Sequence, residues 1–319
     1  MSRPVVSMTV AIAACDRPEP LLRCLSALLG GDAFPAEIIV VDQSRDDSVQ
    51  TAVSKLARQS SPIRYIHQPR LGLSASRKEA LAQSHYSLIA FTDDDCVPDQ
   101  AWLSSLMGAL GEDDGLAAVT GRVLPLGEDR PGTFVVSART ASVAVSFRGK
   151  SVPWTVGTGA NFGAKREWLV RVGGFDERLG AGSPGRAGED SELLYRLLVA
   201  GATIRYVPEA VIYHERQRLV QRLATRRSYG HGIGALCALW LRRGDLYASR
   251  MLAGWLRRQL GQTIRAGAGQ DWLMVRQRLL GLRGCLEGIA YGLKLPDAAI
   301  IPCQASESRP RFVAHDTRG

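Results

Sequence analysis

The first hundred residues alternate short apolar runs with segments of helical spacing. Uninterrupted apolar runs predict buried strands at residues 9–14, 37–41, 63–67 and 87–92. Between them, apolar positions three and four residues apart predict helices at 18–29, 47–59 and 73–84. This order of strand and helix is typical of an α/β protein. We therefore expect a mostly parallel sheet with helices on both faces.

In the rest of the chain, predicted helices and strands are followed by a part in which only helices are predicted. Patterns at the start of this part predict a helix at 102–110, a strand at 116–124, a β-rich stretch at 133–147 and a helix at 165–172. They continue with a helix from 189 to about 200 and two short strands at 203–207 and 210–213. Past residue 214 only helices are predicted, at 217–229, 232–243, 246–265 and 272–293. We expect a mixed α/β domain at 1–214 and a helical region at 215–319.

Composition excludes several classes of protein. With 319 residues and 45% hydrophobic side chains, the chain is ordinary for a globular protein and is not disordered throughout. Six scattered cysteines without a C-x-x-C pair fit neither a disulfide scaffold nor a cysteine-rich zinc site, and favour a reducing compartment. The longest apolar stretch, 232–241, has about half the ~20 residues that cross a bilayer. We expect a cytoplasmic protein without a transmembrane helix.

Positive charge is concentrated in the last third. Residues 215–319 hold 18 Lys and Arg against 7 Asp and Glu, whereas residues 1–214 hold 22 against 24. The basic helices also carry Trp240, Trp255 and Trp272, so they could lie on an anionic membrane surface, such as the inner face of the cytoplasmic membrane. The alternative is that their apolar faces pack on the core or on a partner subunit, with the arginines in solvent. No motif indicates nucleic acid as a partner.

Acidic residues follow three of the predicted strands, where ligands of parallel sheets bind. Asp16 and Asp42, taken singly, are most simply turn formers or helix caps. Asp93, Asp94 and Asp95 are different, because adjacent carboxylates repel by on the order of 1 kcal/mol per close pair. Alternate side chains of an extended segment share a side, so Asp93 and Asp95 can converge on Mg²⁺ or Mn²⁺. A solvated acidic turn is the alternative.

Three further segments could contribute to a site. A glycine-rich loop at 157–163 can bring backbone amides close to a ligand, although many such loops are ordinary turns. The glycine-rich segment 180–188 leads to Glu189 and Asp190 at a helix start, where an acid is normally a cap but could also be delivered by a closing lid. His214 ends a predicted strand, a position more often structural than catalytic.

Seven motifs occur together in one order. They are VVDQSRD (40–46), GLSASRKEA (72–80), TDDDC (92–96), GTGANF (157–162), GGFDERLG (173–180), GEDSELLYRL (188–197) and VPEAVIYH (207–214). Over residues 8–214 the chain closely resembles bacterial family 2 glycosyltransferases. The resemblance implies the GT-A fold of nucleotide-diphospho-sugar transferases, with a donor half at about 1–95 and an acceptor half at about 96–214.

The resemblance also implies roles for individual residues. Donor binding is assigned to Asp42 at the nucleotide base, Arg77 at the diphosphate, Asp93 and Asp94 within the acidic motif, and Gly159 and Asn161 at the sugar. Asp93, Asp95 and His214 are assigned to a divalent cation, Mg²⁺ or Mn²⁺. Asp190 is assigned as the general base of an inverting reaction, with Glu189 as the reserve candidate.

The chemistry of these residues agrees with the resemblance. A cation would neutralise the departing nucleoside diphosphate, and a carboxylate would take the proton of the attacking hydroxyl. No second carboxylate is singled out as a nucleophile, which favours direct displacement with inversion. Lys78, Gln43 and Arg45 depart from the family's usual residues and leave the donor open among UDP, GDP and dTDP sugars. The acceptor is expected to be a carbohydrate or lipid-linked hydroxyl, as in polysaccharide or glycolipid biosynthesis.

Two other functions are weighed against this prediction. A sugar-nucleotide pyrophosphorylase needs a Gly-rich, basic phosphate loop after the first strand, where this chain has Cys15-Asp16-Arg17-Pro18-Glu19. A non-catalytic scaffold that binds sugar nucleotides would have no need of a base such as Asp190. Both remain as alternatives to the glycosyltransferase.

Overall fold

A computed structural model describes residues 3–58, 62–69, 71–113 and 115–296. Its centre is a nine-stranded sheet in which seven strands follow the order β3-β2-β1-β4-β9-β6-β10, with β5 and β8 both paired to β10. The strands are β1 (Val5–Ala14), β2 (Phe34–Asp42), β3 (Ile63–His67), β4 (Leu88–Asp93), β5 (Cys96–Pro98), β6 (Leu116–Pro125), β8 (Val145–Phe147), β9 (Phe162–Lys165) and β10 (Thr203–His214). A separate two-stranded ladder joins β7 (Thr133–Phe134) to β11 (Gln217–Arg218).

The first four predicted strands pair in parallel, and in the other part of the sheet β10 pairs in parallel with β6. β1 pairs in parallel with β2 and with β4, and β2 pairs in parallel with β3. Continuous apolar runs such as Ile38–Val41 are fully buried, as expected for strands covered on both faces. β9 is antiparallel to both of its neighbours, β4 and β6. The expected α/β class with a mostly parallel sheet is confirmed.

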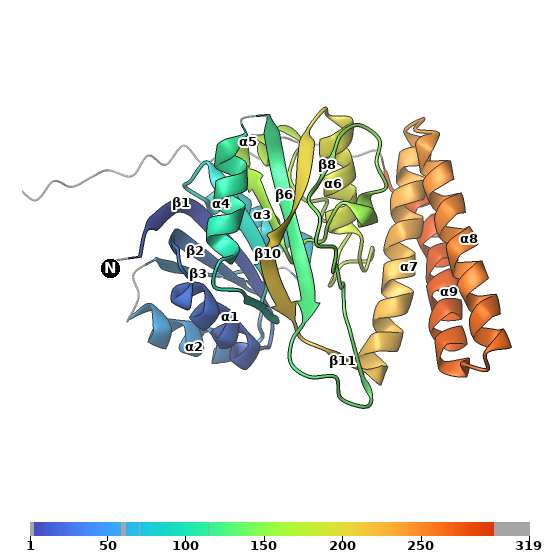
Figure 1. The fold of residues 1–319 in the computed structure, drawn as a ribbon, viewed down its shortest axis with the longest axis horizontal. Coiled ribbons are helices and arrows are strands. Elements are labelled where there is room, and N and C mark those ends of the chain that lie inside the picture. Colours follow the sequence, from blue (N-terminus) through green and yellow to red (C-terminus); the bar gives the residue numbers. More distant parts are fainter. Residues whose placement is uncertain (1–2, 59–61, 70, 114, 297–319) are drawn as a thin grey trace, which may run out of the picture.

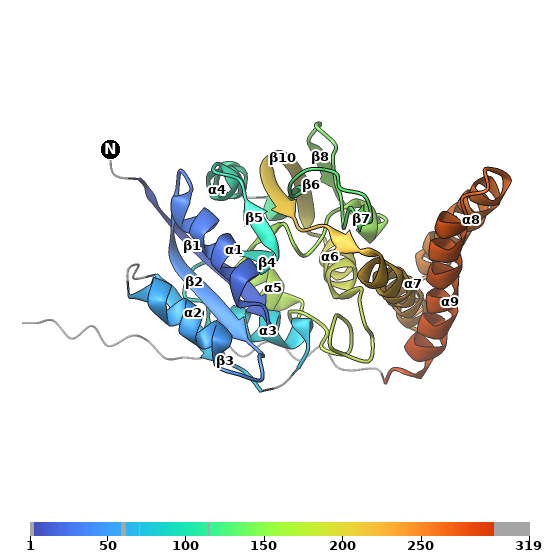
Figure 2. The same cartoon turned by 90° about the horizontal axis from the view of Figure 1, so that it is seen from below.

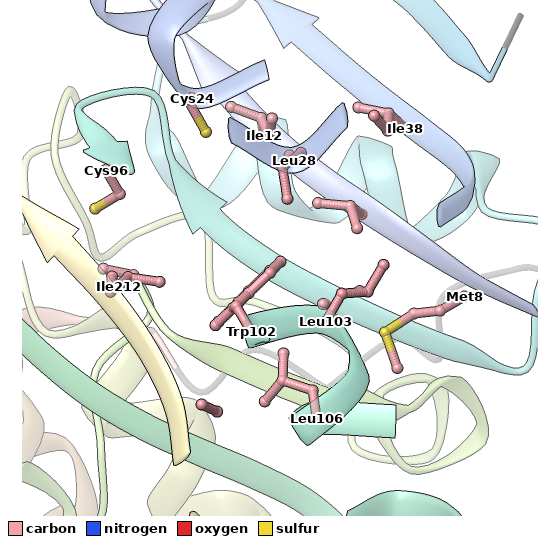
Figure 3. Close-up of a cluster of buried hydrophobic side chains, with 14 of the residues drawn as sticks. Met8, Ile12, Cys24, Leu28, Ile38, Cys96, Trp102, Leu103, Leu106 and Ile212 are labelled. Atoms are coloured by element: carbon pink, nitrogen blue, oxygen red, sulfur yellow. The ribbon is translucent and has the colours of Figure 1, made fainter. Parts of the chain in front are cut away.

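Helices cover both faces of the sheet (Figure 1). One core lies under α1 (Pro18–Gly30), α2 (Ser48–Ala57) and α4 (Trp102–Glu112). Figure 3 shows the helix residues Leu28 and Trp102 in this core together with the strand residues Met8 and Ile12. The other core lies under α3 (Leu73–Gln83), α5 (Arg166–Arg171) and α6 (Glu189–Val199). The two cores fix the sheet from both sides, so its strand ends form a rigid edge.

The sheet differs from the sequence prediction at three places. The two strands expected at 203–207 and 210–213 are one strand, β10, whose pairing with β6 shifts register between Val207 and Val211. The short strands β5 and β9 were not predicted, because three or four residues carry too little periodicity to be recognised. β5 matters for the site, since its pairing places Cys96 opposite His214.

The last described segment is a bundle of three helices beside the sheet (Figures 1 and 2). They are α7 (Leu219–Arg242), α8 (Tyr247–Ala268) and α9 (Trp272–Lys294). The prediction of two helices at 217–229 and 232–243 is wrong, because α7 runs without a break through Gly230, Gly232 and Gly234. These glycines permit close packing: a Cβ at Gly230 would lie 2.0 Å from the carbonyl oxygen of Gly281 on α9. Packing therefore outweighs the low helix propensity of glycine here.

The bundle buries part of its apolar surface within the protein. Trp240 and Trp255, both considered for a membrane surface, are only 8% and 9% exposed, whereas Trp272 is 69% exposed. Within the described residues, no helix combines the length and hydrophobicity that crossing a bilayer requires. The predicted helical region extends to residue 319, but residues 297–319 lie outside the described part.

Five of the six cysteines fall within the described residues, and all five are free thiols: Cys15, Cys24, Cys96, Cys237 and Cys285. Four of them are buried in the packed parts of the molecule, and only Cys15 is exposed. This agrees with the expectation that the chain is not a disulfide scaffold.

Candidate functional site

A two-lobed cavity lies at the carboxyl ends of the parallel strands. The first lobe, about 580 Å³, is bounded by residues that follow β1, β2 and β4, among them Arg17, Gln43 and Asp95. The second, about 610 Å³, is bounded by the 157–160 loop, the start of α6 and helix α7. The lobes share Asp93, His214 and Tyr229 of α7. They also share Leu73 at the start of α3 and two residues of the 180–188 segment, Ala181 and Arg186. The sheet edge and the helical bundle thus build one cavity together.

Four potential metal ligands converge where the lobes meet. One ligand atom from each of Asp93, Asp95, Cys96 and His214 lies within 4.8 Å of the others. Burial raises the pKa of the Cys96 thiol well above its ordinary value, so this side chain stays protonated and is a poor ligand for a hard cation. Asp93, Asp95 and His214 remain, with Nε2 of His214 3.8 Å from Oδ1 of Asp95. The two carboxylates suit Mn²⁺ or Mg²⁺, and the imidazole favours a transition metal such as Mn²⁺.

Asp94 contributes charge behind these ligands. It is 1% exposed, and its Oδ2 has no hydrogen-bond partner among the described residues. Burial is the main cause that raises its pKa to about 7; Asp95 and Asp93 act in the same direction, against Arg17. An orphaned buried carboxylate oxygen beside a cluster of acids is an environment that a cation would relieve. The residues present therefore fit a divalent cation.

Arg17 is a site residue that the sequence analysis did not assign. It follows β1 and forms ion pairs with Asp94 and with Asp95, the latter at 2.8 Å. In the sequence, Arg17 is a basic residue next to Asp16 at the end of a predicted strand. Ordinary turns show the same pattern, so this position alone does not indicate a site residue. In three dimensions it lies across the acidic motif of β4, which is 78 residues away in sequence.

Arg77 joins the acidic motif to the start of α6. This buried side chain on α3 donates to Oδ1 of Asp93 at 2.8 Å and to Oε1 of Glu189 at 3.0 Å. A Cβ at Gly159 would lie 2.5 Å from the Arg77 guanidinium, so only glycine permits this approach. The predicted site residues Arg77, Asp93, Gly159 and Glu189 are thus brought into direct contact.

Glu189 and Asp190 stand in different environments. Burial, assisted by the charge of Asp190, raises the pKa of Glu189, although Arg77 opposes this shift. Glu189 is 6% exposed and is held by the guanidinium of Arg77. Asp190 is half-buried, and its Oδ2 accepts a 2.9 Å hydrogen bond from the amide of Gly159. Asp190 is therefore the more accessible carboxylate, fixed against the glycine-rich loop.

The segment before Glu189 packs closely on helix α7. A Cβ at Gly188, whose φ is +89°, would lie 3.0 Å from the Cα of Gly232. The ring Nδ1 of His231 lies 3.0 Å from the carbonyl oxygen of Gly185, and Arg186 pairs with Glu287 of α9 at 3.0 Å. These contacts hold the 180–188 segment that was considered as a closing lid. The bundle therefore fixes the position of α6's first residues.

Two residues assigned to the donor do not line the cavity. Asp42 is fully buried, and its carboxylate accepts hydrogen bonds from Ser44 and from the Tyr65 hydroxyl at 2.7 Å. Asn161 is also fully buried, and its amide donates to the carbonyl oxygens of Arg122 and Ala210, both at 2.8 Å. Those carbonyls flank the register shift of β10, so Asn161 holds the sheet together there. A glycine-rich motif cannot show from sequence which of its residues face inward.

The glycosyl transferase family 2 model matches residues 9–170. Among curated proteins, the pre-mycofactocin glycosyltransferase of Mycobacterium tuberculosis is 28% identical over 96% of this chain. The chondroitin synthase of Pasteurella multocida is 24% identical over 66% of this chain. The chain spans 62% of the first relative's length and 25% of the second's.

Solved structures with the same fold include two that contain Mn²⁺. The mannosyltransferase PcManGT from Pyrobaculum calidifontis, in complex with GDP-Man and Mn²⁺, aligns with a TM-score of 0.56 at 18% identity, over 88% of each chain. GalNAc-T7 with UDP, GalNAc and Mn²⁺ aligns with a TM-score of 0.52 at 17% identity, over 66% of this chain and 44% of that one. Identities this low support the GT-A fold alone. With the family match over half of its length, the chain belongs to glycosyl transferase family 2.

Proposed function

We propose that this protein transfers a sugar from a nucleotide diphosphate to an acceptor hydroxyl, with inversion at the anomeric carbon. The observation that carries this proposal is one cavity in which the Asp93, Asp95 and His214 cluster and the carboxylate of Asp190 stand on separate elements. The first lobe, at the ends of β1, β2 and β4, is assigned to the donor. The second lobe, beside Asp190, is assigned to the acceptor.

The donor lobe is suited to hold a nucleoside diphosphate. Asp93, Asp95 and His214 would hold a divalent cation, which when bound offsets the negative charge of the leaving diphosphate. Arg17 and Arg77 stand on either side of the acidic motif and would add positive charge there. A bound cation would stabilise the ionised form of Asp94, whose pKa is raised to about 7 without it. This arrangement favours binding of the donor as its metal complex.

The acceptor lobe supplies a base for the attacking hydroxyl. Asp190 would take the proton as the hydroxyl oxygen bonds to the anomeric carbon and the bond to the diphosphate oxygen breaks. The electron pair of that bond leaves with the nucleoside diphosphate. A single displacement of this kind inverts the anomeric configuration. The hydrogen bond from Gly159 fixes Asp190 in place before the substrate binds.

Replacement of the base tests the proposal. We expect Asp190→Asn to lower kcat for sugar transfer by roughly 10²- to 10⁴-fold, because an amide cannot accept the proton. Binding of UDP or GDP with Mn²⁺, measured by calorimetry, should change little. Asp129→Asn is the matched control, since the Asp129 side chain is 84% exposed and lies outside the cavity.

The products distinguish the alternatives. A transferase releases nucleoside diphosphate, and the linkage that it forms has the inverted configuration by NMR. A pyrophosphorylase would instead release a sugar phosphate with nucleoside triphosphate, and a scaffold would bind donor without turnover. Near-normal turnover by Asp190→Asn would remove this residue from its proposed role.

The donor sugar and the acceptor are chosen by screening. GDP-mannose and UDP-N-acetylgalactosamine are the first donors to test, because two structures with the same fold hold GDP-Man and UDP with GalNAc. UDP, GDP and dTDP sugars are each candidates for this chain. The acceptor is proposed to be a carbohydrate or lipid-linked hydroxyl.

The outer face of the bundle is proposed to contact an anionic membrane surface at the inner face of the cytoplasmic membrane. Large apolar side chains on α8 and α9 are exposed, among them Leu260, Ile264, Trp272 and Leu286. Exposed arginines accompany them, and such a mixture suits the boundary of acyl chains and acidic headgroups. We expect the chain to float with vesicles that contain anionic lipid at low salt. Failure to float would retire the membrane proposal and favour a second protein copy as the partner.

A further inference from the structure

The acceptor lobe has a basic wall that the proposed chemistry does not use. Arg222 and Arg226, one turn apart on α7, line this lobe and not the donor lobe. Both belong to the helical bundle, outside residues 9–170 that match the family. Arg278 of α9 interacts with both of them through its charge. These three residues form what we call the arginine cluster.

The arginine cluster is not neutralised by the protein. Nε of Arg222 donates to Oε1 of Gln277 at 3.0 Å, and its Nη1 donates to the carbonyl oxygen of Val135 at 2.8 Å. Nη1 of Arg278 donates to Oε1 of Gln259 at 3.2 Å. These acceptors are all uncharged, and within the described residues no carboxylate forms an ion pair with the cluster.

Arg226 has the least complete hydrogen bonding of the three arginines. Its Nε is buried and, within the described residues, has no hydrogen-bond partner; the same holds for Nε of Arg278. Burial first, and then the charges of Arg222 and Arg278, lower the pKa of Arg226 to about 10. Arg226 is half-buried, and a guanidinium group partly removed from solvent is normally paired, because an unpaired charge there is costly. An anionic ligand would supply the missing acceptors and charge.

The position of the cluster identifies which ligand would carry this anion. The other two arginines near the reacting groups are already paired with acids: Arg17, which lines the donor lobe, and Arg77, which lines the acceptor lobe beside the acidic motif. The arginine cluster is reached through the lobe that contains Asp190, where the attacking hydroxyl must lie. Planar guanidinium groups bind phosphate and carboxylate oxygens through paired hydrogen bonds.

We propose that Arg222 and Arg226 bind a phosphate or carboxylate group of the acceptor, so that this enzyme glycosylates an anionic acceptor in preference to a neutral one. This assignment rests on the proposed function, because it places the acceptor in the lobe beside Asp190. Arg278 supports the site from α9 by keeping its charge close to Arg226. The phosphate of a lipid-linked or free sugar phosphate and the carboxylate of a uronic acid share this chemistry.

Transfer kinetics with matched acceptors test the proposal. Sugars with a phosphate, with a uronic carboxylate and with neither are compared as acceptors for the full-length chain and for the Arg222→Gln/Arg226→Gln variant. We expect kcat/KM for one of the charged acceptors to fall by about 10- to 100-fold in the variant, with little change for the neutral sugar. The acceptor that suffers the loss identifies the anion. Arg226→Lys, which keeps the charge, should recover part of the activity.

Arg257→Gln is the matched control, because Arg257 is exposed on α8 and outside the cavity. The affinity for UDP or GDP with Mn²⁺ is measured in every variant. An equal loss for charged and neutral acceptors would overturn the proposal. So would a matching loss of nucleotide affinity, which would assign the arginines to the donor.

A binding measurement separates this proposal from the proposed function. Inorganic phosphate and glucuronate are titrated into the full-length chain and followed by calorimetry and by thermal unfolding. We expect one of them to bind, and at least tenfold more weakly to Arg222→Gln/Arg226→Gln than to Arg257→Gln. This result would hold even if no sugar transfer were found. Equal binding to both variants, or no binding to the unaltered chain, would contradict the anion site.

Discussion

Two groups of charged side chains in the cavity are balanced in different ways. Around the acidic motif, where the lobes meet, acids and arginines neutralise one another: Arg17 pairs with Asp94 and Asp95, and Arg77 pairs with Asp93 and Glu189. On the α7 wall of the acceptor lobe, Arg222 donates to uncharged acceptors, and Nε of Arg226 has no hydrogen-bond partner among the described residues. The first group is held in place by the protein itself, whereas the second lacks an acceptor that an anionic substrate would supply.

Removal of the cation, or of one of its ligands, should give the largest loss of sugar transfer. We expect chelation with EDTA, or Asp95→Asn, to lower sugar transfer by about 10³-fold or more, because the leaving diphosphate would lose its counter-charge. Mn²⁺ should restore the chelated enzyme but not the variant. Transfer assays with added metal check this, with Asp129→Asn as the control. Full activity after exhaustive chelation would contradict the cation site.

Separation of Arg77 from its acids should give the next largest effect. Arg77→Gln leaves Asp93 and Glu189 without their shared partner, so we expect kcat to fall by about 10- to 100-fold. Gly159→Ala should act in the same direction, because its Cβ would press on the guanidinium. Kinetics that separate kcat from KM, together with thermal unfolding, check that the effect is on the site. Unchanged kcat in both variants would show that this contact has no positioning role.

The contact between α7 and α9 should be sensitive to any side chain. A Cβ at Gly284 would lie 2.0 Å from the carbonyl oxygen of Arg227, so we expect Gly284→Val to destabilise the protein by about 1–3 kcal/mol or more. Gly254→Ala on α8 is the control: nothing lies within 4 Å of its Cβ, and it should stabilise by about 0.5–1 kcal/mol. Urea unfolding measures both. Equal effects would show that the helices do not pack as described.

The smallest expected effect is a pH dependence within the bundle. Hydrogen bonds from Arg227, assisted by Arg283 and Arg186, lower the pKa of Glu287 to about 2. Because the pKa is lower in the folded chain, this stabilisation is fully present above pH 4.5 and is lost as the pH falls toward 2. We expect Glu287→Gln to lower Tm by only a few degrees at pH 7, since the group is near the surface, and by less at pH 3. A Tm difference that does not shrink between these pH values would argue against this ion pair.

Sequence was most informative where local pattern and chemistry coincide. Continuous apolar runs predicted the parallel strands, and the acids that follow residues 87–92 predicted the cluster at Asp93 and Asp95. The role of Asp190 as base remains a prediction, although its side chain does face the cavity. Parallel strands bring their carboxyl ends to one edge, so the order of the elements alone places these residues together.

Features that depend on distant contacts could not be predicted in this way. Arg17 lies across an acidic motif 78 residues away, and Asn161 turns toward the register shift of β10 instead of the cavity. The glycines of α7 led to the prediction of two helices. Their presence inside one helix is explained by the close approach of α9, which a sequence pattern does not show. From the sequence, the arginines of α7 were interpreted as part of a solvated or membrane-facing surface. Only the position of α7 in the fold shows that Arg222 and Arg226 line a cavity.

The most direct test of the account is the position of Mn²⁺ in crystals of the full-length chain grown with UDP or GDP, located by its anomalous scattering. The account predicts a peak within coordination distance of Asp93, Asp95 and His214, with the diphosphate in the lobe formed by the ends of β1, β2 and β4. A nucleotide bound there without the ion, or an ion bound elsewhere in the molecule, would contradict it.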